Sequence, residues 1–253
     1  MDQPSQSNPS ESANHSAAKH HPHFGLRRYS AAEFLITLIL FIAISPFIGD
    51  MAGGRVIESV LMTAVFMAGV LAVGRRRRTL IIACILLIPT LFSKWINHIV
   101  PGLMNDKVFF STGLVFAVFL VIQLLMYILR APRVNSEVVC AGISIYFMLG
   151  LCWMFAYLIV DRIDPKAFAY TVGPAPQMMD RFTCYYFSYS TLSTLGYGDI
   201  VPISRVARML AAMEAMTGTL FIAVLISRLV SLYSSQPHAA GTNTPNIPAN
   251  GGK

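Results

Sequence analysis

The chain of 253 residues is apolar and weakly charged: 55% of its residues are hydrophobic, 12% are charged, and the net charge is +7. Soluble globular domains carry about twice that charged fraction, so the composition excludes an ordinary soluble protein. The positive residues lie between apolar stretches, which indicates membrane topology and excludes a nucleic-acid-binding patch. The four cysteines show no CxxC spacing and are interpreted as small buried hydrophobes. They are Cys84, Cys140, Cys152 and Cys184.

Residues 1–29 are rich in Ser, Asn, Pro and His and are predicted to form a disordered cytoplasmic tail. No short apolar stretch with a cleavage site follows, so we expect the first membrane span itself to direct insertion. Ser30 and Glu33 fit a capping box at the start of that span, in which each side chain binds a backbone N–H of the first turn. Glu33 is therefore interpreted as a helix cap and not as a functional acid.

Hydropathy predicts six membrane-spanning helices, which makes the chain an all-α membrane protein. Each stretch has about 20 residues, enough to cross about 30 Å of hydrocarbon. The approximate spans are 31–48, 56–73, 80–99, 108–129, 138–160 and 203–233. We divide the chain into a four-helix membrane domain at 30–133, a second membrane domain with the last two spans at 134–233 and a disordered cytoplasmic tail at 234–253.

A run of four arginines, Arg75–Arg78, lies in the predicted loop between the second and third spans. Positive loops stay in the cytoplasm, so this run predicts that both termini are cytoplasmic and that the segment before the sixth span enters from outside. A voltage sensor repeats Arg at every third residue of one helix. The fourth span has only Lys107 and Arg130, one at each end, so we expect no voltage sensor. The run is interpreted as a topology anchor with an attraction to anionic lipid.

Residues 161–202, between the last two spans, are too short and too polar in part to form another span. Asp180 is the predicted N-cap of a helix at 181–193. Two glycines, Gly196 and Gly198, follow that helix on either side of Tyr197. Because glycine reaches positive φ freely, they can alternate in conformation with their neighbours, and the backbone can turn its carbonyl groups toward one axis. Backbone carbonyls can replace the water around an alkali cation.

The stretch Thr194-Leu195-Gly196-Tyr197-Gly198-Asp199 resembles the filter signature of the potassium-channel family. Gly-Tyr-Gly alone also occurs in surface turns, but the aromatic, Ser/Thr-rich helix before it and the apolar helix after it favour the filter. The resemblance covers roughly residues 138–233. It implies a re-entrant pore helix and filter between the fifth and sixth helices, a tetrameric pore, and a six-span member lacking the arginine ladder of a voltage sensor.

The resemblance also implies roles for individual residues. The ion-binding filter would consist of Thr194, Leu195, Gly196, Tyr197 and Gly198, with K⁺ held at the first four. Four side chains are expected to support the filter, namely Asp199, Tyr186, Phe187 and Glu214. The family counterpart of Asp199 bonds an aromatic residue on the pore helix, here Tyr186. Tyr186 and Phe187 are expected to form a sleeve around Tyr197.

Glu214 is expected to support the filter from behind, because a charged group inside a membrane is costly unless it has a partner. Some family members carry a carboxylate on the pore helix where this chain has Ser190. The support would come through a hydrogen bond or through Arg208. A salt bridge between subunits is the competing interpretation.

Gly218, on the sixth span, occupies the position of the family's bending glycine. Glycine in a membrane helix also serves close packing, so both a hinge and a packing role remain open. The residues at helical spacing after it are expected to line the cavity and a hydrophobic gate. They are Thr219, Ile222 and Ile226.

We therefore expect a homotetrameric, potassium-selective channel in the lipid of a bacterial cytoplasmic membrane, with no enzymatic activity, no nucleic-acid partner and no cofactor other than K⁺ ions in the filter. One alternative is a cation channel that discriminates poorly between K⁺ and Na⁺. Another is a non-conducting membrane scaffold with a vestigial pore. A third is an intramembrane serine protease, for which Gly142-Ile143-Ser144 is a partial nucleophile motif with Ile145 in place of the final glycine and His98 lies at a span edge.

Overall fold

The computed structural model of the chain describes residues 30–48, 53–74, 77–100, 106–173 and 178–234. Six helices in this part are long and apolar enough to cross a membrane, as predicted. They are α1 (Ala31–Ile48), α2 (Gly54–Val73), α3 (Arg77–Ile99), α4 (Asp106–Leu129), α5 (Ser136–Ile163) and α7 (Arg205–Ser234). A shorter helix, α6 (Arg181–Leu192), lies between α5 and α7 in the chain. The predicted tails, at 1–29 and from 235 onward, lie outside the described residues.

The predicted loop containing four arginines is shorter in the structure than the sequence suggested. Arg77 and Arg78 open α3, while Arg75 and Arg76 lie outside the described residues. Hydropathy places a boundary where charged residues begin, but a helix can continue past that point into the interface, where water solvates the charges. The same effect extends α5 beyond the predicted boundary at Val160 to Ile163.

The start of α1 confirms the capping box. The Glu33 N–H donates to Ser30 Oγ at 3.3 Å, and the Ser30 N–H donates to Glu33 Oε2 at 3.3 Å. The Ala31 N–H donates to Glu137 Oε2, in the first turn of α5, at 2.7 Å. This contact brings the beginnings of α1 and α5 to the same end of the helix bundle.

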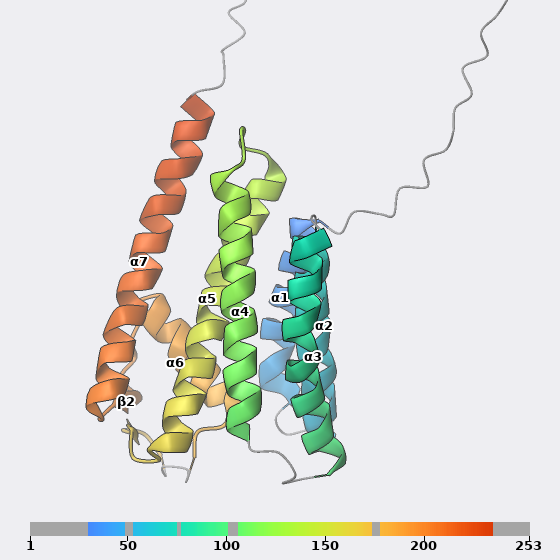
Figure 1. The fold of residues 1–253 in the computed structure, drawn as a ribbon. Helices are drawn as coiled ribbons and strands as arrows, with labels where there is room; N and C mark the ends of the chain where they lie inside the picture. The colour runs from blue at the N-terminus through green and yellow to red at the C-terminus, as the bar shows by residue number, and fades with distance from the viewer. Residues whose placement is uncertain (1–29, 49–52, 75–76, 101–105, 174–177, 235–253) are drawn as a thin grey trace, which may run out of the picture.

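Helix α5 occupies a central position in the fold. It packs against α1, α4, α6 and α7, whereas α7 packs against α5, α6 and the strand before it. Figure 1 shows α7 at one edge of the molecule and α1–α3 on the opposite side, with α4 and α5 between them. The pore region is therefore attached to the first four helices mainly through α5.

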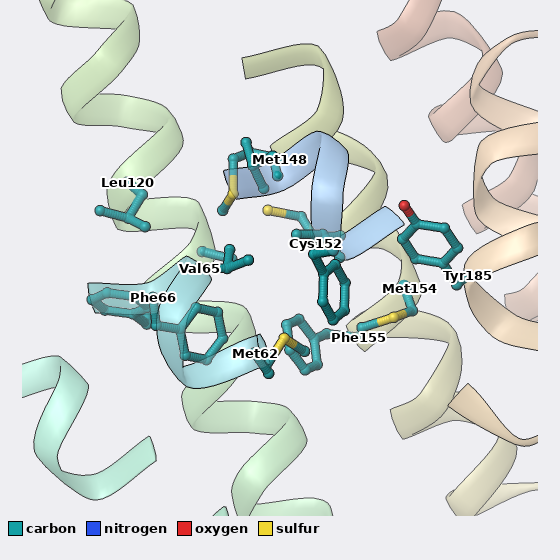
Figure 2. Packing of buried hydrophobic residues seen from close by; sticks show 14 of the residues in the cluster. Met62, Val65, Phe66, Leu120, Met148, Cys152, Met154, Phe155 and Tyr185 are labelled. Carbon is teal, nitrogen blue, oxygen red and sulfur yellow. The ribbon is translucent and has the colours of Figure 1, made fainter. Parts of the chain in front are cut away.

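Aromatic side chains connect α1, α2 and α4 with the pore region in one hydrophobic core (Figure 2). The Phe66 ring on α2 lies 5.0 Å from the Phe116 ring on α4 and 6.4 Å from the Phe155 ring on α5. On α1, the Phe41 ring meets the edge of Tyr185 on α6 at 6.2 Å. Because these rings come from five helices, packing in one part of the bundle constrains the position of the others.

Two short strands, which the sequence analysis did not predict, correct the all-α expectation in one detail. Strand β1 (Phe168–Tyr170) pairs with β2 (Ile200–Pro202) in antiparallel register, with Ala169 opposite Val201. Three-residue strands are too short for a hydropathy window to detect. The available signal was alternation of Phe168 and Tyr170 together with two consecutive β-branched residues at 200–201.

Candidate functional site

Helix α6 begins at the predicted N-cap. The Thr183 N–H donates to Asp180 Oδ1 at 2.9 Å, which satisfies one of the free donors of the first turn. The helix ends at Leu192, one residue before the predicted boundary, and the Ser193 N–H donates to the Tyr189 carbonyl at 3.1 Å. Since helix C-termini carry partial negative charge, the end of α6 that leads into residues 193–199 favours a cation.

The backbone after α6 alternates in conformation. Thr194, Gly196 and Gly198 have positive φ values of 59°, 52° and 78°, while the residues between them do not. Among the described residues, Thr194 is the one non-glycine with positive φ, and for a β-branched residue this conformation is strained. Such strain is maintained where the surrounding structure enforces it, often at a functional site. The alternation that the glycine positions predicted is therefore present and begins one step earlier, at Thr194.

Hydrogen bonds hold this segment by its N–H groups. The Leu195 and Gly196 N–H groups donate to the Ser190 carbonyl at 2.8 and 3.1 Å. In the part of the chain that the structure describes, no hydrogen-bond donor reaches the carbonyl oxygens of residues 194–197. The segment is thus anchored to the end of α6 while four consecutive carbonyl groups stay available to a ligand.

The next two carbonyl groups are engaged by the protein itself. The Thr171 hydroxyl donates to the Gly198 carbonyl at 2.8 Å, and the Thr171 N–H donates to the Asp199 carbonyl at 2.9 Å. Thr171 directly follows β1, so the small sheet holds the C-terminal end of the segment 194–199. Burial raises the pKa of the neighbouring Tyr170 to about 12, so its phenol remains neutral at physiological pH. Because Thr171 occupies the Gly198 and Asp199 carbonyls, the run of free carbonyl groups ends at Tyr197.

The two pore-helix aromatics expected around Tyr197 lie in different surroundings. The Tyr186 ring stacks on the Tyr197 ring with 6.4 Å between centroids and a 4° angle between planes. Phe187 is buried against α5 and β1 instead, 4.9 Å from the Tyr157 ring and 5.4 Å from the Phe168 ring. Within one chain, Tyr186 supports the segment after α6 and Phe187 anchors α6 to the core.

Asp199 is placed between the filter segment and β2. Its Oδ1 accepts a hydrogen bond from the Ile200 N–H at 3.0 Å, and its carboxyl interacts with the Tyr186 phenol. Asp199 and Tyr186 also line the same surface pocket. The structure thus brings together the pair that the family resemblance implied.

Glu214 lies in a buried polar cluster between α5, α6 and α7. Its carboxyl oxygens lie 2.6 Å from Ser188 Oγ on α6 and 2.5 Å from the Tyr157 hydroxyl on α5. All three residues are fully buried. The expected partner Arg208 instead donates from Nε to the Pro202 carbonyl at 3.1 Å. The sequence left open whether Glu214 bonds to Arg208 or forms another hydrogen bond. The structure shows hydrogen-bond contacts with Ser188 and Tyr157.

Gly218 lies where α7 passes the end of the pore helix. A Cβ atom at this position would lie 2.2 Å from the Leu192 carbonyl oxygen, which is backbone and cannot move aside. The packing role that the sequence left open is therefore present, while the hinge remains a prediction. The three expected cavity residues lie after Gly218 on an exposed face of α7 in the single chain. They are Thr219, Ile222 and Ile226.

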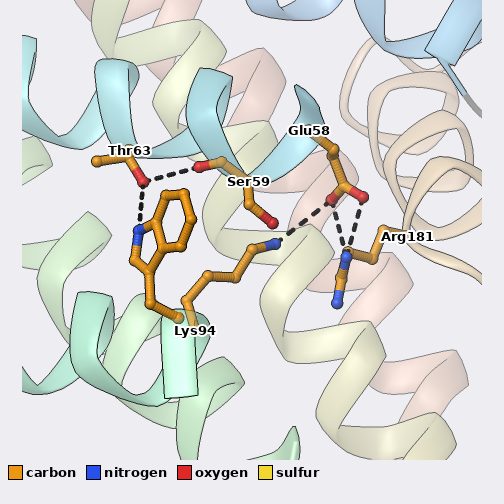
Figure 3. Close-up of polar contacts among 6 residues, drawn as sticks. Glu58, Ser59, Thr63, Lys94 and Arg181 are labelled. Atoms are coloured by element: carbon orange, nitrogen blue, oxygen red, sulfur yellow. Dashed lines mark hydrogen bonds and ion pairs between the residues drawn. The ribbon is translucent and has the colours of Figure 1, made fainter. Parts of the chain in front are cut away.

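A charged cluster at the N-terminus of α6 was missed by the sequence analysis (Figure 3). Arg181 Nη1 donates to both carboxyl oxygens of Glu58 on α2, at 3.1 and 2.9 Å. The buried Lys94 on α3 lies 3.7 Å from the same carboxyl group and 4.9 Å from the Phe109 ring. The available signal was the presence of Glu58 and Lys94 inside apolar spans, where charged groups need partners.

A second link joins the C-terminal parts of α4 and α7. Arg228 Nη2 donates to the carbonyls of Leu129 and Ala131, at 2.9 and 3.4 Å. Leu129 is the last residue of α4, where carbonyl groups lack partners inside the helix. The first four helices are therefore linked to the pore region at both ends, through Glu58 and through Arg228.

The partial protease motif that the sequence offered as an alternative is part of a continuous helix, α5. Ser144 is buried in α5 and its hydroxyl donates to the Cys140 carbonyl at 2.8 Å. This contact leaves Ser144 as an ordinary helix residue with its proton engaged.

Comparisons with known proteins identify the region that contains these features. Residues 148–235 match the sequence family described as Ion channel. The chain is 45% identical to Two-pore potassium channel 4 of Arabidopsis thaliana over 47 residues, covering 19% of this chain and 16% of that protein. It is 38% identical to Voltage-gated potassium channel Kch of Escherichia coli over 61 residues, covering 24% of this chain and 14% of that protein.

A longer match extends beyond the pore region. The chain is 25% identical over 142 residues to the human Voltage-gated potassium channel regulatory subunit KCNG1, covering 53% of this chain and 27% of that protein. The chain therefore spans between 14% and 27% of the lengths of these relatives. No solved structure matches it significantly. The matches define an ion channel domain in a multi-pass membrane protein. This part of the chain is similar to potassium channels.

Proposed function

We propose that this protein is a potassium-selective channel that conducts K⁺ passively through the carbonyl oxygens of Thr194, Leu195, Gly196 and Tyr197. The observation that carries the proposal is the alternating backbone of residues 194–198, tied through its N–H groups to Ser190. A hard alkali cation prefers oxygen ligands, and carbonyl dipoles can replace its hydration shell. The C-terminal end of α6 adds partial negative charge beside them.

The pore requires four copies of the chain around one axis. Residues 193–198 are exposed in the single chain, with Leu195 at 56% and Tyr197 at 67%. Non-helical backbone at membrane depth is tolerated where protein buries it or where it lines a water-filled path. A homotetramer supplies both conditions, because neighbouring chains cover the side chains and the carbonyl groups face the shared axis.

We also propose that the channel lies in a cytoplasmic membrane with both termini in the cytoplasm, and that no arginine helix gates it. Arg77 and Arg78 at the start of α3 support this orientation. Helix α4 carries Asp106 and Lys107 in its first turn and no further charge through Leu129. A helix without regularly spaced charges experiences little force from the membrane potential.

The test is K⁺ and Na⁺ flux through purified protein in liposomes, with Gly196→Ala as the disabling variant. Gly173→Ala is the matched control, because both glycines have positive φ and open space around a built Cβ, yet Gly173 lies outside the filter. We expect the wild type and the control to pass K⁺ over Na⁺ and Gly196→Ala to lose selective flux. A bilayer recording with K⁺ on one side and Na⁺ on the other that reverses near zero voltage would instead support the weakly selective channel.

A silent wild type that still forms tetramers would support the non-conducting alternative. That alternative is worth testing because one relative, KCNG1, is named a regulatory subunit. Co-reconstitution with a conducting potassium channel then decides whether the silent chain changes its partner's current.

A further inference from the structure

The polar cluster around Glu214 contains a hydrogen that has to be accounted for. Ser188 Oγ lies within hydrogen-bond distance of two oxygens, the Gly150 carbonyl at 2.8 Å and Glu214 Oε1 at 2.6 Å. The Tyr157 hydroxyl contacts the other carboxyl oxygen, Oε2. The cluster therefore has three short oxygen–oxygen contacts, formed by residues of α5, α6 and α7.

Each of these contacts needs one hydrogen. A serine hydroxyl has a single proton to donate, and a backbone carbonyl can only accept. If the Glu214 carboxyl group were ionised, Ser188 could satisfy only one of its two neighbours. The other contact would then bring two oxygens to hydrogen-bond distance with no hydrogen between them.

A neutral Glu214 removes this conflict. Glu214 Oε1 then donates to Ser188 Oγ, Ser188 donates to the Gly150 carbonyl, and Tyr157 donates to Glu214 Oε2. Every donor has an acceptor and every short contact has one hydrogen. The direction of the chain of hydrogen bonds follows from the fixed acceptor at Gly150.

The surroundings also disfavour a charged carboxyl group. Glu214 is fully buried, and the ion pairs among the described residues do not include it. The ionisable groups that face it are the phenols of Tyr157 and Tyr146 on α5 and of Tyr189 on α6. None of them is a cation, and an unpaired buried anion is far more costly than a neutral acid.

We propose that Glu214 is held as a neutral carboxylic acid at physiological pH and that its proton locks the pore helix to the outer and inner helices. The lock acts through Ser188, two residues before Ser190, whose carbonyl holds the filter N–H groups. Glu214 is thus a positioning residue. Removing its proton leaves either Ser188–Gly150 or Ser188–Glu214 without a hydrogen and loosens the support of the filter.

Infrared spectroscopy of the full chain in liposomes tests the protonation state directly. The difference between wild type and Glu214→Gln at neutral pH should contain the C=O stretch of a protonated carboxyl group, shifted in D₂O. Ser188→Ala should move this band toward a weaker hydrogen bond, which provides a second measurement if Glu214→Gln does not fold. An ionised-carboxylate band without the acid band at neutral pH overturns the proposal.

Asp161→Asn is the matched control. Asp161 is also buried, at 2% exposure, but its Oδ2 accepts from Arg162 at 2.9 Å and from the Met179 N–H at 3.1 Å. A carboxyl group with a cationic partner and a backbone donor should remain ionised. We expect this variant to lose a carboxylate band and to leave the acid band unchanged.

The effect on conduction rests on the proposed channel function and is measured separately. Wild-type K⁺ flux should fall as alkaline pH removes the Glu214 proton. Glu214→Gln should keep its flux over the same range, because the amide donates to Ser188 and accepts from Tyr157 as the neutral acid does. Identical alkaline profiles for both proteins overturn the positioning role. A wild type without any flux counts against the channel function, while the infrared bands still decide the protonation state.

Discussion

The two long helices of the pore region, α5 and α7, differ sharply in how much the chain itself buries them. In the apolar stretch of α5, 56% of the residues are buried inside the chain, whereas in that of α7 only 11% are buried. Their hydropathies are similar, 2.1 and 1.9, so composition does not explain the difference. The position of each helix does: α5 is surrounded by four helices, and α7 lies at the edge of the bundle (Figure 1).

Exposed apolar side chains and exposed backbone carbonyl groups at this edge of the bundle have different consequences in a membrane. Lipid can cover the exposed apolar side chains of α7, because hydrocarbon and leucine are equally apolar. Lipid cannot satisfy the free carbonyl groups of residues 194–197. Under the proposed function, residues 194–197, more than α7 itself, therefore require neighbouring chains.

The largest expected effect is a difference in unfolding free energy between a substitution on α5 and one on α7. Phe155→Ala on α5 removes a fully buried ring that packs on Phe66 and Phe109, and should cost about 3–5 kcal/mol. Leu220→Ala on α7, where the side chain is 64% exposed, should stay within about 0.5 kcal/mol in solubilised single chains. Unfolding in detergent measures both values. Equal losses would remove the distinction between α5 and α7.

Gly218→Ala tests the place where α7 is packed most closely. The new Cβ would press against the Leu192 carbonyl, so we expect a loss of about 1–3 kcal/mol in unfolding free energy. Ala223→Ser, at an exposed position of the same helix, is the control. Normal stability with altered channel opening would favour the hinge over the packing role.

Glu58→Gln tests the charged cluster that links α2 and α3 to the N-terminus of α6. The variant leaves the buried Lys94 without its ion partner and weakens the hold on Arg181. Lys94 is buried and Arg181 is partly exposed to solvent. We therefore expect the unfolding free energy to fall by about 1–2 kcal/mol, between the values for exposed and for fully buried ion pairs. Adding Lys94→Met should recover part of this loss in a double-mutant cycle. Simple additivity would show that the two charges are not coupled.

Arg228→Gln tests the link between α4 and α7 and has the smallest expected effect. It removes the hydrogen bonds from α7 to the Leu129 and Ala131 carbonyls, at a cost of about 1 kcal/mol. Arg205→Gln, exposed in the first turn of α7, should cost less. Thermal unfolding compares the two variants. An equal change in both would mean that the Arg228 hydrogen bonds contribute no stability.

Much of the local structure was predictable because its signals lie close together in the chain. Apolar stretches of about 20 residues located all six spans, and the caps at Ser30 and Asp180 depend on residues three positions away. The alternation at Gly196 and Gly198 follows from the lack of a Cβ atom. The positive φ of Thr194 had no such signal, because threonine rarely adopts it.

The amino-acid sequence by itself therefore determined the six spans, the N-cap of α6 and the alternating backbone at Gly196 and Gly198, since each depends on local periodicity or backbone freedom. Only the tertiary structure decided the partners of Glu214, which are Ser188 and Tyr157, 26 and 57 positions away in the chain. It likewise paired Glu58 with Arg181, 123 positions away. It also decided why Gly218 has no room for a side chain. Contacts of this kind depend on which helix faces meet, and many helix arrangements satisfy the same pattern of apolar residues.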